Sequence, residues 1–275
     1  MLLWGGGWTA LKILTCQLPM DVIIFWRFFI MSLSFLPILY FFKEPIALNK
    51  NSILFIMASS ALNVAFMISS FLGIKYGLAG AGSVIITSLS PIMTFILMAA
   101  LFKKRVLKLQ YVGLVVGLVG AFVILELHDL SQFLNGANAY LLLGATMWAG
   151  VTILAQKANA HIHPVHYSFF ISLVATFVSF GYAFNSDLSA VFDQGFKFWV
   201  ALIYLSILGQ TLATTIFYMA SGKIGSEKTS SFMFLVPIFA LLSAWAVLGE
   251  PIQAHIVVGG AISMLAVIFI NKSAK

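Results

Sequence analysis

The sequence predicts an all-α integral membrane protein in which ten transmembrane helices form two inverted five-helix repeats. Three observations predict this fold class. Hydrophobic residues make up 61% of the 275 residues, and charged residues only 8%. Apolar stretches of about 20 residues, the length that crosses a bilayer as a helix, recur along the whole chain. Several landmarks of the first half recur in the second half in the same order.

The composition indicates that the surface faces lipid. A soluble domain carries about 25% charged residues, so a chain with 8% cannot cover itself with polar side chains. The lipid bilayer is therefore a predicted partner. The net charge of +7 does not indicate nucleic-acid binding, because the basic residues lie between apolar blocks rather than along one stripe. The single cysteine, Cys16, cannot form an intrachain disulfide.

Splitting the chain at charges and turn residues gives the ten predicted spans. Their ranges are 2–18, 20–42, 52–74, 77–102, 109–127, 139–157, 165–184, 198–221, 228–249 and 254–271. None of them alternates polar and apolar residues as a half-buried strand would. Because backbone polar groups in lipid must be satisfied within the protein, these segments are expected to form a helix bundle. The first span lacks the basic start of a signal peptide, so we interpret it as a retained helix.

The basic residues also predict the orientation. With a cytoplasmic N-terminus, eleven of the fifteen Lys and Arg residues lie on the inner side, three lie at outer ends, and Arg27 lies within a span. This asymmetry follows the positive-inside rule. We therefore expect a multi-pass protein of the cell (inner) membrane with both termini in the cytoplasm.

Matching landmarks divide the chain into two predicted repeats, residues 1–130 and 137–275. Pro91 in LSPIMTF has its partner in Pro237 of LVPIFAL, 146 positions later. The stretch GLVVGLVGA (113–121) aligns with GGAISMLAV (259–267), and Trp4 matches Trp148. Because each repeat holds an odd number of spans, the two repeats insert with opposite orientations. Inverted repeats of this kind are typical of alternating-access transporters.

The paired prolines interrupt two of the predicted helices. Pro91 cannot donate a hydrogen bond to the carbonyl of Thr87, and Pro237 likewise leaves the carbonyl of Met233 without its usual donor. A freed carbonyl in the membrane must meet a neighbouring helix, a hydroxyl group or water. Two interpretations follow. The prolines either shape both helices around a midplane cavity or form static packing kinks.

Several stretches resemble the EamA domains of the drug/metabolite transporter superfamily. They are LLWGGGWTALKI (2–13), IKYGLAGAGSVIITSLSPIMT (74–94), TMWAGVTILAQK (146–157) and VLGEPIQAHIVVGGAISMLAVIF (247–269). The resemblance covers essentially the whole chain and implies ten helices, inverted repeats and the export of small metabolites, often amino acids. In one departure, Lys103 and Lys104 stand where the family commonly has a Gly-Glu pair, which Gly249 and Glu250 provide in the second repeat.

Polar and aromatic residues at helical spacing mark a candidate substrate cavity between the repeats. Residues four apart lie on one helix face, and matching spans of the two repeats carry similar residues there. The candidates are Trp4, Trp8, Arg27, Asn63, Thr87, Trp148, Thr152, Ser172, Gln210 and Thr214. Hydroxyl groups in membrane helices also bond to their own backbone or join helices, and tryptophans also form interfacial belts. These alternatives stay open for the residues concerned.

Arg27 is the strongest of these candidates, because a charge within a membrane span is costly and indicates function. Its neighbours Trp26 and Phe28 are apolar. A guanidinium group in this place is suited to bind a carboxylate or a phosphate through two hydrogen bonds. Alternatively, the side chain extends to the outer interface, where Asp21 is its possible partner.

These patterns predict a transporter of a small organic metabolite. No catalytic motif or nucleotide-binding loop occurs, so we expect neither an enzyme nor a cofactor. The cluster of His161, His163 and His166 lacks a fourth ligand beside it, so no metal site is predicted. No carboxylate lies deep in a predicted span, which argues against a proton relay through a buried acid.

Two other functions stay open. A carrier of sugar phosphates or nucleotide sugars needs more than one buried cation, whereas Arg27 alone qualifies in this sequence. A non-transporting membrane subunit or intramembrane enzyme does not need matching polar faces in both repeats. A monomer suffices for transport, although the small residues Gly113, Gly117 and Gly259 also permit a homodimer.

Overall fold

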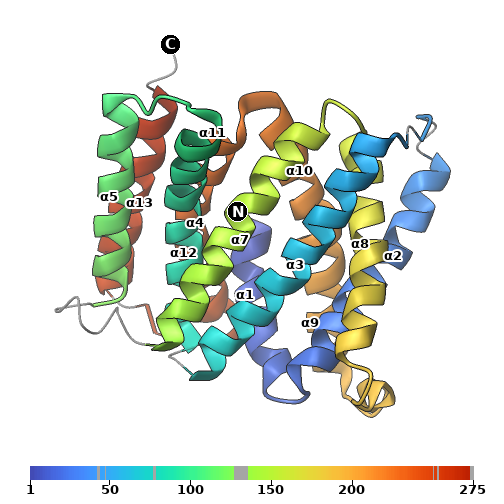
Figure 1. Ribbon diagram of the computed structural model, residues 1–275. Helices are drawn as coiled ribbons and strands as arrows, with labels where there is room; N and C mark the ends of the chain where they lie inside the picture. Colours follow the sequence, from blue (N-terminus) through green and yellow to red (C-terminus); the bar gives the residue numbers. More distant parts are fainter. Residues whose placement is uncertain are drawn as a thin grey trace.

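The computed structural model describes residues 1–41, 44–46, 48–76, 79–126, 136–249, 251–252 and 254–272. All regular structure within these ranges is helical (Figure 1). The main helices are α1 (Leu2–Thr15), α2 (Met20–Phe41), α3 (Lys50–Tyr76), α4 (Ala79–Phe102), α5 (Lys108–Ile124), α7 (Gly136–Ala158), α8 (Pro164–Tyr182), α9 (Phe196–Ile203), α10 (Thr215–Ile224), α11 (Ser226–Ser231), α12 (Val236–Leu248) and α13 (Ala254–Lys272). Three short or irregular helices complete them: η1 (Leu188–Val191), η2 (Tyr204–Thr214) and η3 (Phe232–Leu235).

Eight of the described helical segments are long and apolar enough to cross a membrane. Two of these are composite: Phe196–Ile224 joins α9, η2 and α10, and Ser226–Leu248 joins α11, η3 and α12. The helix α5 has 17 residues and α1 has 14, so both are shorter than the roughly 20 residues of a full crossing. Each predicted span falls on a helical segment, but ten full crossings remain a prediction. Glu250 and the connection 127–135 between the predicted repeats lie outside the described residues.

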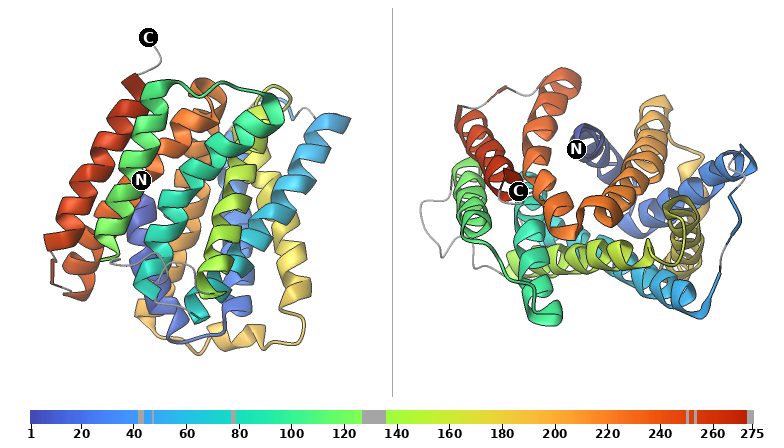
Figure 2. Two further views of the ribbon diagram at one scale, coloured as in Figure 1. Left: turned by 60° about the vertical axis from the view of Figure 1, so that its left-hand side comes forward. Right: turned by 90° about the horizontal axis from the view of Figure 1, so that it is seen from above.

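Helices from the two halves of the chain lie side by side. The helix α5 packs on α13, α3 packs on α7, and α2 packs on α8. Figures 1 and 2 show that α5 runs antiparallel to α13, and α2 runs antiparallel to α8. The core is therefore built mainly from contacts between distant parts of the sequence.

Glycines bring α5 and α13 into close contact. A Cβ atom added at Gly120 would lie 2.5 Å from Ser263 Oγ and 2.9 Å from the carbonyl oxygen of Gly259. Gly113 is similarly close to the α13 backbone, with the carbonyl of Ala266 at 3.0 Å from its added Cβ. These small residues thus act within the chain, where they let two helix backbones approach each other.

The helix α1 begins near half the height of the bundle and runs to its lower end in the view of Figure 1. The counterpart helix α7 runs the opposite way, from the lower end upward. The first two turns of α1 carry Trp4 and Trp8, so these side chains start from the middle of the bundle rather than from a rim.

Two helices change their geometry in the middle of the bundle. The segment η2 is a π-helix of 11 residues between α9 and α10. The segment η3 is a single 3₁₀ turn before α12, where Pro237 occupies the first helical turn and the N–H of Val236 donates to the carbonyl of Met233. Pro91, by contrast, lies inside the assigned helix α4. The matched prolines therefore have different local consequences.

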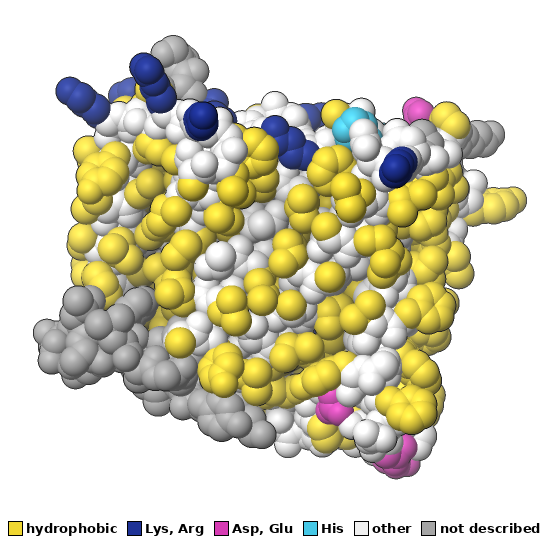
Figure 3. Space-filling view, viewed as in Figure 1, with side chains coloured by type: hydrophobic (Ala, Val, Ile, Leu, Met, Phe, Trp, Pro, Cys, Tyr) yellow, Lys and Arg dark blue, Asp and Glu magenta, His cyan; other side chains and the backbone are white. Residues whose placement is uncertain are grey.

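Hydrophobic side chains cover the middle of the face shown in Figure 3. Lys and Arg side chains gather along its upper rim, the end at which the chain terminates in Figure 1. An apolar band with a basic rim is the surface expected of a protein that crosses a membrane.

Candidate functional site

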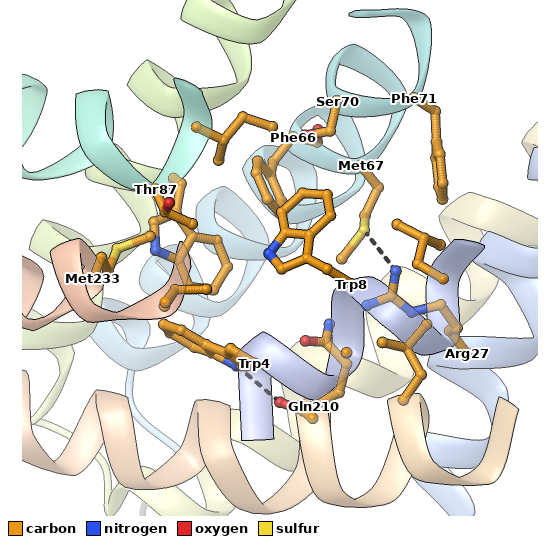
Figure 4. A pocket seen from close by; sticks show the side chains of 17 residues that line it. Trp4, Trp8, Arg27, Phe66, Met67, Ser70, Phe71, Thr87, Gln210 and Met233 are labelled. Carbon is orange, nitrogen blue, oxygen red and sulfur yellow. Dashed lines mark hydrogen bonds between the residues drawn. The ribbon is translucent and has the colours of Figure 1, made fainter. Parts of the chain in front are cut away.

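A cavity of about 100 Å³ lies between helices of both chain halves. Side chains from α1, α2, α3, α4, α7, η2, η3 and α12 form its walls (Figure 4). The lining residues are Trp4, Gly7, Trp8, Leu11, Arg27, Phe66, Met67, Ser70, Phe71, Ile86, Thr87, Trp148, Leu205, Gly209, Gln210, Met233 and Val236. The set is mainly aromatic and aliphatic, with a few polar groups among them.

Arg27 supplies the only formal charge among the described lining residues. It comes from α2, and only 6% of its surface is exposed. Its Nη1 donates to the thioether sulfur of Met67 at 3.3 Å, and its Nε has no hydrogen-bond partner. Because a thioether is a weak acceptor, most of the hydrogen-bonding capacity of this buried cation is unused within the described part of the chain.

Asp21, the predicted interfacial partner of Arg27, is engaged elsewhere. Its carboxylate accepts a hydrogen bond from Ser186 Oγ in the segment after α8. The guanidinium group of Arg27 instead lies beside Trp8 and Met67 at the cavity wall (Figure 4).

Aromatic rings form the opposite wall. The Trp4 and Trp148 rings meet edge to face at 5.4 Å between centroids, and Phe66 lies 5.0 Å from Trp148. Phe217 packs against both tryptophans, with its ring centroid 4.9 Å from that of Trp4 and 5.9 Å from that of Trp148. Trp148 is 4% exposed, and its Nε1–H has no hydrogen-bond partner among the described residues. This wall therefore offers ring surfaces together with one unused donor.

The π-helical segment η2 contributes polar groups between the two walls. The carbonyl of Gly209 accepts from Trp4 Nε1 at 3.0 Å and from Thr214 Oγ1 at 3.2 Å. Gln210 is 5% exposed, and its amide points toward the space between Trp4, Trp8 and Arg27 (Figure 4). A π-helix inside an α-helical segment occurs frequently at functional sites, and here it positions the amide and the carbonyl at the cavity.

The residues four positions before the two prolines also line the cavity. Thr87 and Met233, whose carbonyls lack the usual donor because of Pro91 and Pro237, both line it. The carbonyl of Met233 regains a donor through the 3₁₀ turn of η3. Both proline positions therefore adjoin the walls of the cavity.

Four of the predicted candidates lie outside the lining. Asn63 donates to Ser59 O at 3.0 Å and to the Tyr218 hydroxyl at 3.2 Å, so its amide joins α3 to α10. Thr152 donates to the carbonyl of Trp148 within its own helix. Ser172 donates to its own helix backbone and accepts from Ser32 of α2. Thr214 supports Gln210 from one turn away.

Several lining residues escaped the sequence analysis. Met67, Phe66 and Phe71 on α3 are apolar, and nothing in their spacing distinguishes them from lipid-facing residues.

The sequence also did not identify Glu227, which lies outside the cavity lining, because the predicted span started at residue 228. The structure places it in the first turn of a spanning segment, 5% exposed, with Lys104 Nζ at 2.6 Å from its carboxylate.

Two of the three clustered histidines, His163 and His166, lie with their rings edge to face at 6.1 Å between centroids, whereas His161 packs elsewhere. His161 stacks on Phe55 at 5.6 Å between ring centroids, and His163 caps α8 by accepting from the N–H of Val165. Within the described ranges, no three His, Cys, Asp or Glu side chains are grouped as for a metal ion.

The chain is similar to known proteins over most of its length. Residues 1–126 and 136–272 match the EamA-like transporter family. The uncharacterized transporter YyaM of Bacillus subtilis is 24% identical over 88% of this chain and 81% of that protein. An S-adenosylmethionine uptake transporter of Rickettsia prowazekii is 25% identical over 96% of this chain and 87% of that protein. A solved crystal structure matches with a TM-score of 0.78 at 14% identity, covering 99% of this chain and 96% of the other, which shows the fold alone.

Proposed function

The chain belongs to the EamA-like transporter family, and on this premise we propose that it carries a small organic metabolite with an anionic group across the cell membrane by alternating access. The observation that carries the proposal is Arg27, a buried cation at the wall of a cavity that both chain halves form. An intramembrane charge is costly to retain. A substrate anion compensates that cost when it binds.

The arrangement of the helices supports two inverted repeats, residues 1–130 and 137–275, with ten crossings in all. The counterpart helices α1 and α7 run in opposite directions, as do α2 and α8, and α5 and α13. Two stretches of the chain, one in each half, match the family. In this proposal the halves rock about the cavity, as in other transporters with inverted repeats.

The distribution of basic residues supports both termini in the cytoplasm of a cell (inner) membrane protein. Export is the direction that the resemblance implies, and we retain it as part of the proposal. The Rickettsia prowazekii relative is named an uptake transporter, so the direction needs its own measurement.

A substrate with one negative charge fits the cavity better than a sugar phosphate or a nucleotide sugar. A phosphate monoester carries up to two negative charges at neutral pH, and buried charges need paired partners. Among the described lining residues Arg27 is the only cation. A second cationic side chain, which a dianion needs, is not among them.

Reconstitution into liposomes tests this function. We expect flux of one or more small organic acids or amino acids from a panel that also contains sugar phosphates. Replacing Arg27 by Gln should lower that flux about tenfold or more, because a hydrogen bond to a charged group contributes about 1.5–3 kcal/mol. Lys12→Gln is the matched control, since Lys12 is exposed and outside the cavity lining. Absence of flux across the whole panel would overturn the proposal.

A further inference from the structure

We infer that the cavity selects a net monoanion, a carboxylate without a compensating ammonium group, over the zwitterionic amino acid of the same shape. This inference rests on the proposed function and narrows its substrate class. It starts from the charges around the cavity. Arg27 is the single formal charge among the described residues that line it.

The described acidic side chains either bind other residues or lie exposed outside the cavity. Glu227 pairs with Lys104, Glu126 lies 2.9 Å from His255, and Asp21 accepts from Ser186. Asp187 accepts from Ser189, and the remaining described acids, Glu44 and Asp193, are exposed. The lining of the cavity therefore has a net positive charge that none of these acids neutralises.

The net charge of the loaded site decides between the two ligand classes. A monoanion bound at Arg27 brings the site to neutrality. A zwitterion brings its own ammonium group, so the loaded site keeps a net positive charge in a setting where charges are costly. A cation–π contact with the tryptophans recovers only part of the cost of removing an ammonium group from water.

Two hydrogen-bond acceptors of η2 at the cavity are already engaged. The carbonyl of Gly209 already accepts from Trp4 Nε1, and it shares the single hydroxyl proton of Thr214 with Gln210 Oε1. By contrast, unused donors are available. Within the described part of the chain, Arg27 Nε and Trp148 Nε1 are both buried without a partner. These two unused donors suit a ligand that accepts hydrogen bonds.

A 2-oxo carboxylate with an apolar body meets these requirements. Its carboxylate pairs with the guanidinium group of Arg27, and its apolar body extends toward the rings of Trp4 and Phe66. The matching amino acid differs only at the α-carbon, where an ammonium group replaces the oxo oxygen. Comparing such pairs isolates the effect of net charge.

The test measures binding to the purified full chain by thermal stabilisation and tryptophan fluorescence. The pairs are phenylpyruvate with phenylalanine, and 4-methyl-2-oxopentanoate with leucine. We expect each 2-oxo acid to bind about tenfold or more tightly than its amino acid. Arg27→Gln should weaken the binding of the 2-oxo acids and remove the preference for them over the amino acids. Equal or tighter binding of the amino acids overturns the inference.

Liposome flux separates this inference from the function on which it rests. If neither the 2-oxo acids, the amino acids nor a wider panel is transported, the proposed function fails. If amino acids are transported in preference to the 2-oxo acids, transport stands and the inference about net charge fails.

Discussion

Arg27 shows how a single residue can oppose the stability of the fold. Arg27 is 6% exposed and its guanidinium group donates to the Met67 sulfur, although a buried charge needs strong, well-placed partners. Residues of this kind are retained when function requires them, because activity and stability often trade against each other. The cost of this buried charge is the reason why a bound anion should stabilise the protein.

We therefore expect Arg27→Met to raise the stability of the ligand-free protein by about 1–3 kcal/mol, since it removes an uncompensated buried charge and keeps most of the side-chain volume. The measurement is thermal or denaturant unfolding in detergent. Lys12→Met, at an exposed position of α1, should change stability by no more than about 0.5 kcal/mol. A clearly lower stability of Arg27→Met would show that Arg27 supports the fold rather than the ligand.

The cavity residues could be predicted from the sequence only where a polar or aromatic side chain differs from the apolar span around it. Helical spacing in an apolar background identified candidates, of which six line the cavity: Trp4, Trp8, Arg27, Thr87, Trp148 and Gln210. The contact between Arg27 and Met67 could not be predicted, because a methionine in a membrane span has no distinctive signal. Asn63 resembled Gln210 in sequence, yet its amide is engaged by Tyr218 and the backbone of α3.

At the scale of secondary structure, the apolar runs located the helical segments, but they carried no sign of η2 or η3. A π-helix and an α-helix have the same composition, and their difference arises from packing in three dimensions. Thr211 and Thr214 in η2 donate to carbonyls five residues earlier, Ser206 and Gly209. Contacts of this kind become visible only in the folded chain.

The two interpretations of the prolines lead to different results. If Pro237 shapes the cavity, Pro237→Ala restores an N–H donor for Met233, favours a regular helix and lowers flux several-fold at equal or higher thermal stability. If Pro237 only packs, its replacement lowers stability and leaves flux per folded molecule unchanged. Flux and melting temperature, measured on the same preparation, distinguish these outcomes. Pro251→Ala, at an exposed position between α12 and α13, is the control.

The glycines of α5 and α13 predict a packing effect at the same scale. In Gly120→Ala the new methyl group must displace Ser263 or the carbonyl of Gly259, which should cost about 1–3 kcal/mol of stability. Gly181→Ala on α8 is the control, because nothing lies within 4 Å of its added Cβ. There the gain in helix propensity should leave stability unchanged or slightly higher. Equal effects of the two substitutions would contradict tight packing between α5 and α13.

At the scale of the whole molecule, polar contacts join the two halves of the chain at both ends of the bundle. Lys104, after α4, pairs with Glu227 on α11 at one end. Glu126, after α5, lies 2.9 Å from His255 on α13 at the other end. If the halves rock about the cavity, these contacts change in alternation, because opening one end separates the residues that meet there. The proposed motion thus acts on polar contacts at both ends of the bundle.

The last prediction tests the inversion itself. Cys16 ends α1, and Ala160, 144 positions later, occupies the corresponding place after α7; both are exposed. In two inverted repeats these positions face opposite sides of the membrane. With a cytoplasmic N-terminus, a membrane-impermeant maleimide should label Cys16 in intact cells.

The matching variant carries Ala160→Cys together with Cys16→Ser. It should be labelled only after the membrane is permeabilised, and a protein carrying Cys16→Ser alone should stay unlabelled in both conditions. Reversed sidedness of the two cysteines would keep the inversion but overturn the proposed orientation. Labelling of both positions from the same side would mean that the two halves cross the bilayer in the same direction. The pairing of α1 with α7 as inverted counterparts would then be wrong, and with it the basis for alternating access about this cavity.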